Sequence, residues 1–192
     1  MTTNTLLTHI HQKVPLTEAD NSLILPYFTP KLLRRRQYLL QEGAICTHLS
    51  FVAKGLVKAF NIDEKGIEHI SLFGSEGWWI SDFGSFVNAV PGMLNIDAIE
   101  DTELLMISRE NYEELLQKIP KMERYFRILY QNSLVTKDKR LISSITDSAE
   151  EKYLGFANNF PQIVQRLPQN LIASYLGLAP ETISRIRKRQ AK

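Results

Sequence analysis

The spacing of apolar residues changes along this chain of 192 residues, and each change predicts a different kind of element. Near the start, Leu6, Ile10 and Val14 recur at helical spacing, which predicts a helical lead-in over residues 5–28. From residue 31 to about residue 108, short apolar runs end at glycines 11 to 12 residues apart, a spacing typical of an antiparallel sandwich or barrel. Residues 63–66, Asp-Glu-Lys-Gly, predict a hairpin turn, and residues 96–107 predict a last pair of strands. We therefore expect an all-β unit.

After residue 107 the apolar spacing becomes helical. Ser108 predicts a helix cap. A second helix, from about residue 120 to residue 145, has no internal glycine or proline and would be about 35 to 40 Å long. Such a helix has more apolar surface than a small sheet can cover, so we expect it to pair two copies of the chain; the alternative is packing wholly within its own chain. The dimer-helix candidates are Met122, Phe126, Leu129, Tyr130 and Leu134.

The end of the chain predicts two short helices joined by a tight turn, after a helix over residues 149–160 and a connector over residues 161–167. Gly177 predicts the end of the first short helix, where a left-handed residue can stop it. Pro180 suits the first position of the second, because its missing N–H would have been unpaired there. Ile183 and Ile186 are three residues apart and form a docking face on this second helix.

Positive charge is concentrated in the same tail. Residues 166–192 hold six basic residues and one acidic residue, a net charge of +5, so the preceding 165 residues carry −3 of the total of +2. A nearly neutral body with a basic end is typical of a nucleic-acid module attached to another unit. The alternative is a solvated basic helix, which the apolar docking face makes a poorer interpretation.

The polar face of the second helix has the residue types that read DNA. Arg185 can bond bidentately to a guanine edge, Glu181 can accept from a cytosine amino group, and Thr182 can contact a backbone phosphate. The candidate DNA-contacting residues are Gln169, Pro180, Glu181, Thr182, Ser184, Arg185, Arg187, Lys188 and Arg189.

These stretches resemble transcription regulators of the cyclic-AMP receptor protein and fumarate-nitrate reduction regulator (CRP/FNR) family. The matching residues are 172–177 (IASYLG) and 180–186 (PETISRI), with weaker matches at the turns Leu40–Gly43, Phe51–Gly55 and Gly66. The resemblance covers nearly the whole chain. Pro180 and Ala179 depart from the family's pattern, so the sequence of the DNA half-site is not transferred from it.

The resemblance implies an α+β architecture in three parts. These are a cyclic-nucleotide-binding-like β jelly roll with flanking helices over residues 1–119, a long dimerisation helix over 120–146, and a helix-turn-helix domain of the winged-helix type over 147–192. It also implies a homodimer on a palindromic double-stranded DNA site, with half-sites one helical turn or ~34 Å apart, and contact with RNA polymerase.

The residues argue against cyclic AMP as the effector. The family's nucleotide cassette needs a Gly-Glu pair and an Arg-Ser or Arg-Thr pair, but the corresponding stretches here are GWWISDF (77–83) and PGMLN (91–95), and no arginine lies between Arg36 and Arg109. A buried phosphate needs a cation or a cluster of backbone donors. The ligand-pocket candidates are Trp78, Trp79, Ser81, Asp82 and Phe83, although aromatic residues in such a stretch are more often simply core. A regulator that takes a nucleotide or another small ligand in a non-standard pocket is the alternative.

Other cofactors and activities find little support. Cys46 is the single cysteine and cannot supply the four thiolates of an iron–sulfur cluster, and the four scattered histidines do not predict haem or another metal site. A cupin-like metalloenzyme would need closely spaced histidines in the β unit, where His48 and His69 stand alone, so we expect no enzyme activity. A third class of function is a sensor that binds only protein partners.

Cysteine use and hydropathy predict a cytoplasmic protein. One cysteine fits a reducing compartment, and the first residues lack the long apolar core of a signal peptide. Residues 77–96 are apolar enough to suggest a membrane span, but they include Asp82, Asn88, Pro91 and Asn95, so we expect folded core and no membrane.

Overall fold

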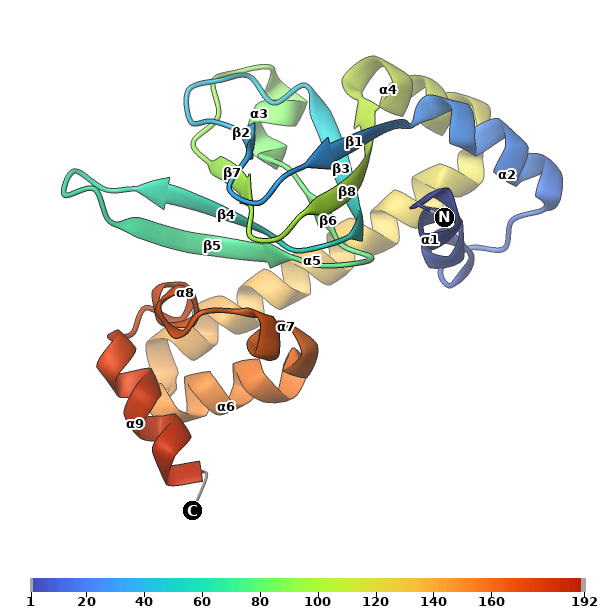
Figure 1. The fold of residues 1–192 in the computed structure, drawn as a ribbon. Helices are drawn as coiled ribbons and strands as arrows, with labels where there is room; N and C mark the ends of the chain where they lie inside the picture. Colours follow the sequence, from blue (N-terminus) through green and yellow to red (C-terminus); the bar gives the residue numbers. More distant parts are fainter. Residues whose placement is uncertain (1, 191–192) are drawn as a thin grey trace. The chain divides into compact units, whose positions relative to one another are not determined.

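The structure is a computed structural model that describes residues 2–190 (Figure 1). These residues form two compact units, one comprising residues 2–61 and 72–130 and the other residues 62–71 and 131–190. The helices are α1 (Thr2–His11), α2 (Glu18–Ile24), α3 (Phe83–Asn88), α4 (Arg109–Lys118), α5 (Pro120–Thr146), α6 (Ala149–Asn159), α7 (Pro161–Arg166), α8 (Gln169–Leu176) and α9 (Pro180–Gln190). The strands are β1 (Thr29–Leu33), β2 (Tyr38–Leu40), β3 (His48–Lys54), β4 (Val57–Ile62), β5 (Glu68–Gly74), β6 (Trp79–Ile80), β7 (Asn95–Ala98) and β8 (Thr102–Ser108).

The strands form two four-stranded sheets, in the orders β1-β8-β3-β6 and β2-β7-β4-β5. The pair β3 and β8 is antiparallel, with Phe51 opposite Leu105, and β4 and β7 are antiparallel with Ala59 opposite Ile96. Apolar residues from both sheets form one buried cluster, which is the interior of the sandwich: Leu33, Val52, Val57, Ala59, Ile80, Ile96, Ala98 and Leu104. The predicted all-β unit is confirmed, since strands occupy most of residues 29–108.

Two short helices lie where the sequence pattern predicted none. Helix α3 interrupts the strands, and the Asp82 side chain caps it by accepting a hydrogen bond from the Ser85 N–H. Helix α7 lies in the expected connector and begins with Pro161 at its first turn. Each has six residues, which is too short for a helical repeat of apolar positions to show in the sequence.

A second apolar cluster joins helices α1, α4 and the start of α5 to the sheet that contains β3 and β8. Its members include Leu6, Phe51, Leu105, Leu115 and Phe126. Two of the dimer-helix candidates lie here, because Met122 is 0% and Phe126 is 2% exposed. Their assignment to a dimer contact is therefore corrected: the first turns of α5 complete the core of their own chain. Leu129 and Tyr130 are partly buried against the same cluster.

Tyr125 ties three elements of this unit together through its hydroxyl. The indole Nε1–H of Trp79 donates to the Tyr125 oxygen at 2.9 Å, and the oxygen lies 2.7 Å from Nδ1 of His9. Burial, with a smaller contribution from Lys13, lowers the pKa of His9 to about 4, so the imidazole is neutral at neutral pH and can accept the phenol hydrogen. Tyr125 itself is fully buried, and burial raises its pKa.

The ends of the C-terminal helices follow from local residues. Ser148 and Glu151 form a capping box at the start of α6, and Gly177 ends α8 in the left-handed region with φ 66°. No helix among residues 2–190 is long and apolar enough to cross a membrane. The apolar stretch 77–96 forms β6, α3 and the start of β7.

We expect Tyr125→Phe to lower the free energy of unfolding by roughly 1–3 kcal/mol, because the Trp79 N–H and His9 Nδ1 both lose a buried partner. Urea denaturation followed by tryptophan fluorescence measures this, since both tryptophans lie in the same unit as Tyr125. The control is Tyr38→Phe at a position 42% exposed, with an expected change within about 0.5 kcal/mol. Equal effects of the two substitutions would contradict the role of the Tyr125 hydroxyl.

Candidate nucleic-acid interface

Helices α8 and α9 form a helix-turn-helix pair at the end of the described chain (Figure 1). Ile172 and Ala173 of α8 and Ile183 and Ile186 of α9 are buried, at 0 to 5% exposure. Burying an isoleucine side chain contributes roughly 1.5–3 kcal/mol, so the two isoleucines of α9 stabilise its packing in this unit. The predicted docking face is therefore present, and residues 178–179 lie in the turn between the helices. The described residues end with α9 and contain no wing strand after it.

The opposite face of α9 is polar, basic and open. Glu181, Arg185 and Lys188 are exposed, and Ser184 and Thr182 are half-buried. Pro180, Arg187 and Arg189 are also exposed, as is Gln169 at the first position of α8. The structure therefore brings eight of the nine candidate DNA-contacting residues together on α9 and places Gln169 at the start of its partner helix. Lys192, part of the basic tail, lies outside the described residues.

Two polar residues near this pair were not singled out from the sequence. Ser174 of α8 hydrogen-bonds with the backbone of Glu68 and Ile70, and the Arg140 guanidinium of α5 donates to the carbonyls of Ile70 and Tyr175. A serine and an arginine on helices carry no spacing signal for such contacts, because their partners lie about 35 to more than 100 residues away.

The later part of α5 exposes apolar side chains. Leu134, the fifth dimer-helix candidate, is 61% exposed, and it is followed by Val135, Leu141, Ile142 and Ile145 at 52 to 76%. Leu134 and Leu141 are seven residues apart, as are Val135 and Ile142, which places both pairs on one side of the helix.

The compact unit of residues 2–61 and 72–130, here called the β-roll unit, contains a cavity of about 370 Å³. Its lining is apolar and uncharged polar, with no aspartate, glutamate, lysine or arginine: Tyr38, Leu39, Leu40, Gln41, Ala44, Ile45, Cys46, Thr47, His48, Ser50, Ile80, Ser81, Ile96 and Met106. Burial raises the pKa of the Cys46 thiol and lowers that of His48, so both groups favour their neutral forms. The cavity can therefore hold a small uncharged molecule more readily than an anion.

Of the five ligand-pocket candidates, only Ser81 lines this cavity. Trp79 belongs to the aromatic core, 5.1 Å from the Phe126 ring, and Phe83 lies 4.7 Å from the Tyr130 ring. Trp78 is half-buried. Asp82 is 6% exposed.

Both carboxylate oxygens of Asp82 are occupied by backbone donors. Oδ1 accepts from the Ser85 N–H at 3.0 Å, and Oδ2 accepts from the N–H groups of Met93 at 2.8 Å and Leu94 at 3.2 Å. These are the kind of clustered backbone donors that can hold an anionic ligand, and here they hold the chain's own carboxylate. Gly92 lies so close that a Cβ there would be 2.9 Å from Oδ2.

Among residues 2–190, no three histidine, cysteine, aspartate or glutamate side chains converge as they would around a metal ion. Cys46 is buried, and its thiol lies 3.3 Å from the backbone oxygen of His48.

Comparison with known proteins agrees with this architecture. Residues 30–119 match the cyclic nucleotide-binding domain family. The chain is 26% identical over 191 residues to the regulatory protein HlyX of Actinobacillus pleuropneumoniae, an alignment that covers 92% of this chain and 76% of that protein. It is 27% identical over 176 residues to the fumarate and nitrate reduction regulatory protein of Vibrio cholerae, covering 84% and 68%.

The fold is shared with solved structures. FixK2 from Bradyrhizobium japonicum superimposes with a TM-score of 0.75 at 18% identity, covering 85% of this chain and 84% of that one. One assignment accounts for the β-roll, the long helix, the terminal helix pair and the regulators that align along most of the chain. Most of the chain is similar to transcription regulators of the CRP/FNR family, and residues 30–119 match the cyclic nucleotide-binding domain family.

Proposed function

We propose that two copies of this chain pair through the later part of α5 and read a palindromic promoter site with α9, under the control of a β-roll that does not take a cyclic nucleotide. The observation that carries the proposal is the division of α9 into a buried isoleucine face and an exposed basic face. In this proposal the bound dimer contacts RNA polymerase, and the protein acts in the cytoplasm without catalysing a reaction.

The exposed face of α9 supports the two kinds of contact that a DNA reader needs. Arg185 lies on the face opposite the buried isoleucines, where its fork of donors can meet the O6 and N7 atoms of a guanine. Arg187 and Arg189 flank this face and are exposed, so they can contact phosphates on either side of a groove. The net charge of +5 over residues 166–192 adds a favourable and salt-dependent attraction to DNA.

The apolar stripe of α5 supports pairing of two chains. Leu134, Val135, Leu141, Ile142 and Ile145 are all more than half exposed, which is unusual for five large apolar residues on one helix. A second copy of the same helix would cover them, and seven-residue spacing is the pattern that two helices bury between them.

The β-roll cavity supports an effector other than cyclic AMP. A cyclic nucleotide carries a phosphate that must be balanced, and the cavity has no cationic side chain in its lining. The backbone donors of residues 85, 93 and 94 are already taken by Asp82. The neutral lining of the cavity favours an uncharged small molecule as the effector in place of a cyclic nucleotide. The single buried cysteine supports the absence of an iron–sulfur cluster.

We expect Arg185→Ala to relax base preference at one position in each half-site, with a loss of roughly 1–3 kcal/mol of discrimination. Selection of bound DNA from a random pool, followed by competition with single-base variants of the selected site, measures the preference. Arg189→Ala is the matched control, expected to weaken binding to all sequences alike and to reduce the salt dependence. An unchanged preference profile in Arg185→Ala would refute this assignment.

We expect Leu141→Asp to raise the dimer dissociation constant at least roughly tenfold, because it buries a charge in an apolar contact. Sedimentation analysis measures the change. Thr136→Asp is the control, since it adds the same charge at an exposed position on the opposite side of α5. Dimers of equal strength in both variants would show that the stripe is not the pairing surface.

We expect the purified wild-type protein to show no binding of cyclic AMP at micromolar concentration by titration calorimetry, for want of a cation or free backbone donors. Binding of the selected DNA by the same preparation serves as the control for folded protein. A micromolar dissociation constant for cyclic AMP would overturn the proposal for the β-roll.

A further inference from the structure

Strand β5 is the last strand of its sheet, so one of its edges has no neighbouring strand. An open edge presents backbone N–H and C=O groups that need partners, and Ile70 on this strand is only 3% exposed. The residues that supply these partners come from α8 and α5. We call residues 62–71, which join and include parts of β4 and β5, the hairpin end. It belongs to the same compact unit as α8, α9 and the later part of α5.

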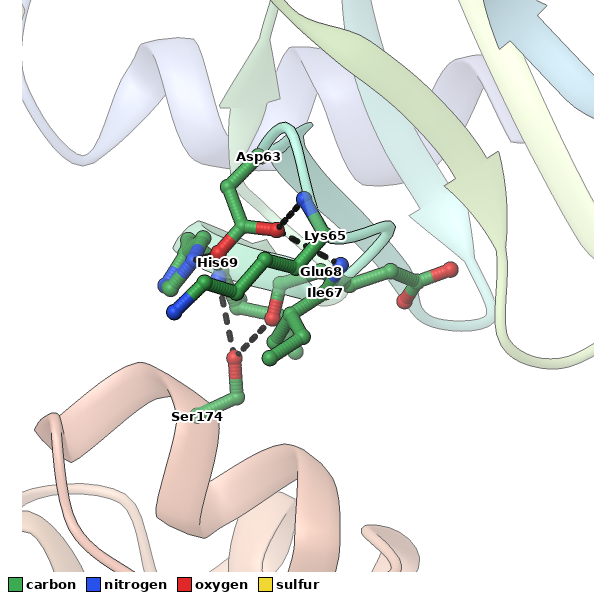
Figure 2. Close-up of polar contacts among 7 residues, drawn as sticks. Asp63, Lys65, Ile67, Glu68, His69 and Ser174 are labelled. Carbon is green, nitrogen blue, oxygen red and sulfur yellow. Dashed lines mark hydrogen bonds and ion pairs between the residues drawn. The ribbon is translucent and has the colours of Figure 1, made fainter.

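Ser174 of α8 takes the place of a neighbouring strand along this edge. Its hydroxyl donates to the Glu68 carbonyl at 2.6 Å and accepts from the Ile70 N–H at 3.1 Å. Figure 2 shows the Ser174 side chain directed at the strand, with both hydrogen bonds converging on its oxygen. One hydroxyl therefore satisfies both an acceptor and a donor of the open edge.

Arg140 of α5 joins the same edge to the end of α8. Its guanidinium donates to the carbonyls of Ile70 at 3.3 Å, Ser71, and Tyr175 at 2.9 Å. It also lies 3.9 Å from the centre of the Tyr175 ring, which in turn packs 5.1 Å from Phe156. The Tyr175 carbonyl is in the last turn of α8, where helix carbonyls lack partners within the helix. One planar cation thus connects α5, β5 and α8.

The hairpin end is held in shape by its own residues. Oδ1 of Asp63 accepts from the N–H groups of Lys65 and Ile67, both at 2.9 Å, and Oδ2 lies 2.9 Å from Nε2 of His69. Gly66 adopts φ 79°, which a residue with a side chain rarely does. The His69 hydrogen bond lowers the pKa of Asp63, so the carboxylate is charged and accepts all three bonds at neutral pH. The contacts that shape this platform for Ser174 therefore come from residues 63–69 themselves and do not involve α8 (Figure 2).

These contacts leave the DNA-reading surface and the pairing stripe open. Ser174 lies on α8, whereas the exposed basic face is on α9. On α5, helical spacing places Arg140 about 120° around the axis from Leu134 and about 100° from Leu141, so its side chain leaves the helix on a different side. The hairpin end can therefore bind the helix pair while DNA and a second chain occupy the other faces.

We propose that the hairpin end is the platform that fixes the DNA-reading helix pair relative to α5, with Ser174 and Arg140 as positioning residues that set the separation of the two reading helices in a dimer. This inference rests on the proposed function, because the separation has meaning only for a dimer on a two-fold site. In this proposal the hairpin end helps to select the distance between the two DNA half-sites. That role is separate from base contact by α9 and from pairing of the two chains.

Binding to DNA with one or two half-sites tests the proposal in the full-length chain. We expect Ser174→Ala to lose roughly tenfold in affinity for the selected two-fold site but to bind a duplex with one half-site scrambled as wild type does. The loss should shrink on duplexes whose half-sites are moved by single base pairs, because the helix pair is no longer held at one separation. Arg140→Lys keeps the charge but loses the planar fork, and should show the same pattern.

Two variants separate positioning from a general loss of fold. Ser174→Thr keeps the hydroxyl and should restore wild-type affinity and spacing preference. Ser22→Ala removes an exposed helical serine hydroxyl elsewhere and should change neither. Equal losses of Ser174→Ala on one-half-site and two-half-site DNA, or no loss on either, would overturn the proposal. If wild type binds neither duplex, the proposed function itself fails, and that result is distinct from a difference between variants.

Amide hydrogen exchange at Ile70 gives a readout that does not involve DNA. The Ile70 N–H should exchange faster in Ser174→Ala than in wild type and Ser174→Thr, while the Ile67 N–H, which is bonded to Asp63, should be unchanged. Equal exchange at Ile70 in all three proteins would show that Ser174 does not hold this edge, and would overturn the proposal.

Discussion

The structure depends on a single helix that passes through two environments. At its start, Met122, Tyr125 and Phe126 of α5 are buried in the apolar cluster of the β-roll unit. Further along, Leu134, Leu141 and Ile145 are exposed on one side, and Arg140 is hydrogen-bonded on a different side. Between its first and last turns, the backbone N–H groups of an α-helix donate to the carbonyls four residues earlier, so α5 needs no outside partners for its backbone there. The buried start of α5 and its later part therefore belong to different compact units, although one helix contains both.

Buried polar groups help to determine how the elements around α5 are arranged. The Tyr125 hydroxyl and the Arg140 guanidinium bind partners from elements distant in sequence, and the Asp82 carboxylate accepts from three backbone N–H groups 3 to 12 residues away. Leaving such groups without partners in a buried site costs more than a satisfied hydrogen bond contributes. They therefore select one arrangement of the elements over others that bury the same apolar area. Asp82 also has a consequence for function, since its carboxylate occupies donors that a ligand's anion would need.

In the helix-turn-helix pair, packing and polar contacts are divided between two faces of α9. Two buried isoleucines dock α9, and every basic residue of the described part of that helix is left exposed. Because apolar burial provides the energy that docks α9, the side chains of its basic face are not needed for packing. Substitutions on that face can therefore alter base preference without unfolding the helix pair. The adjoining hairpin end contacts α8 through backbone groups of β5, so it constrains where the pair lies without constraining which bases the pair contacts.

The sequence alone determined the class of elements and the location of the helix-turn-helix pair. Glycine spacing predicted the strands, an uninterrupted apolar repeat predicted α5, and Gly177 with Pro180 predicted the turn before α9, because each signal is local and depends on backbone conformation or helical period. Only the tertiary structure decided which apolar residues of α5 are core and which are exposed, since Met122 and Leu134 have the same character in the sequence. It alone also brought together Asp82 with Met93, and Ser174 with Ile70. Those contacts depend on how distant segments meet, which a pattern of neighbouring residues does not contain.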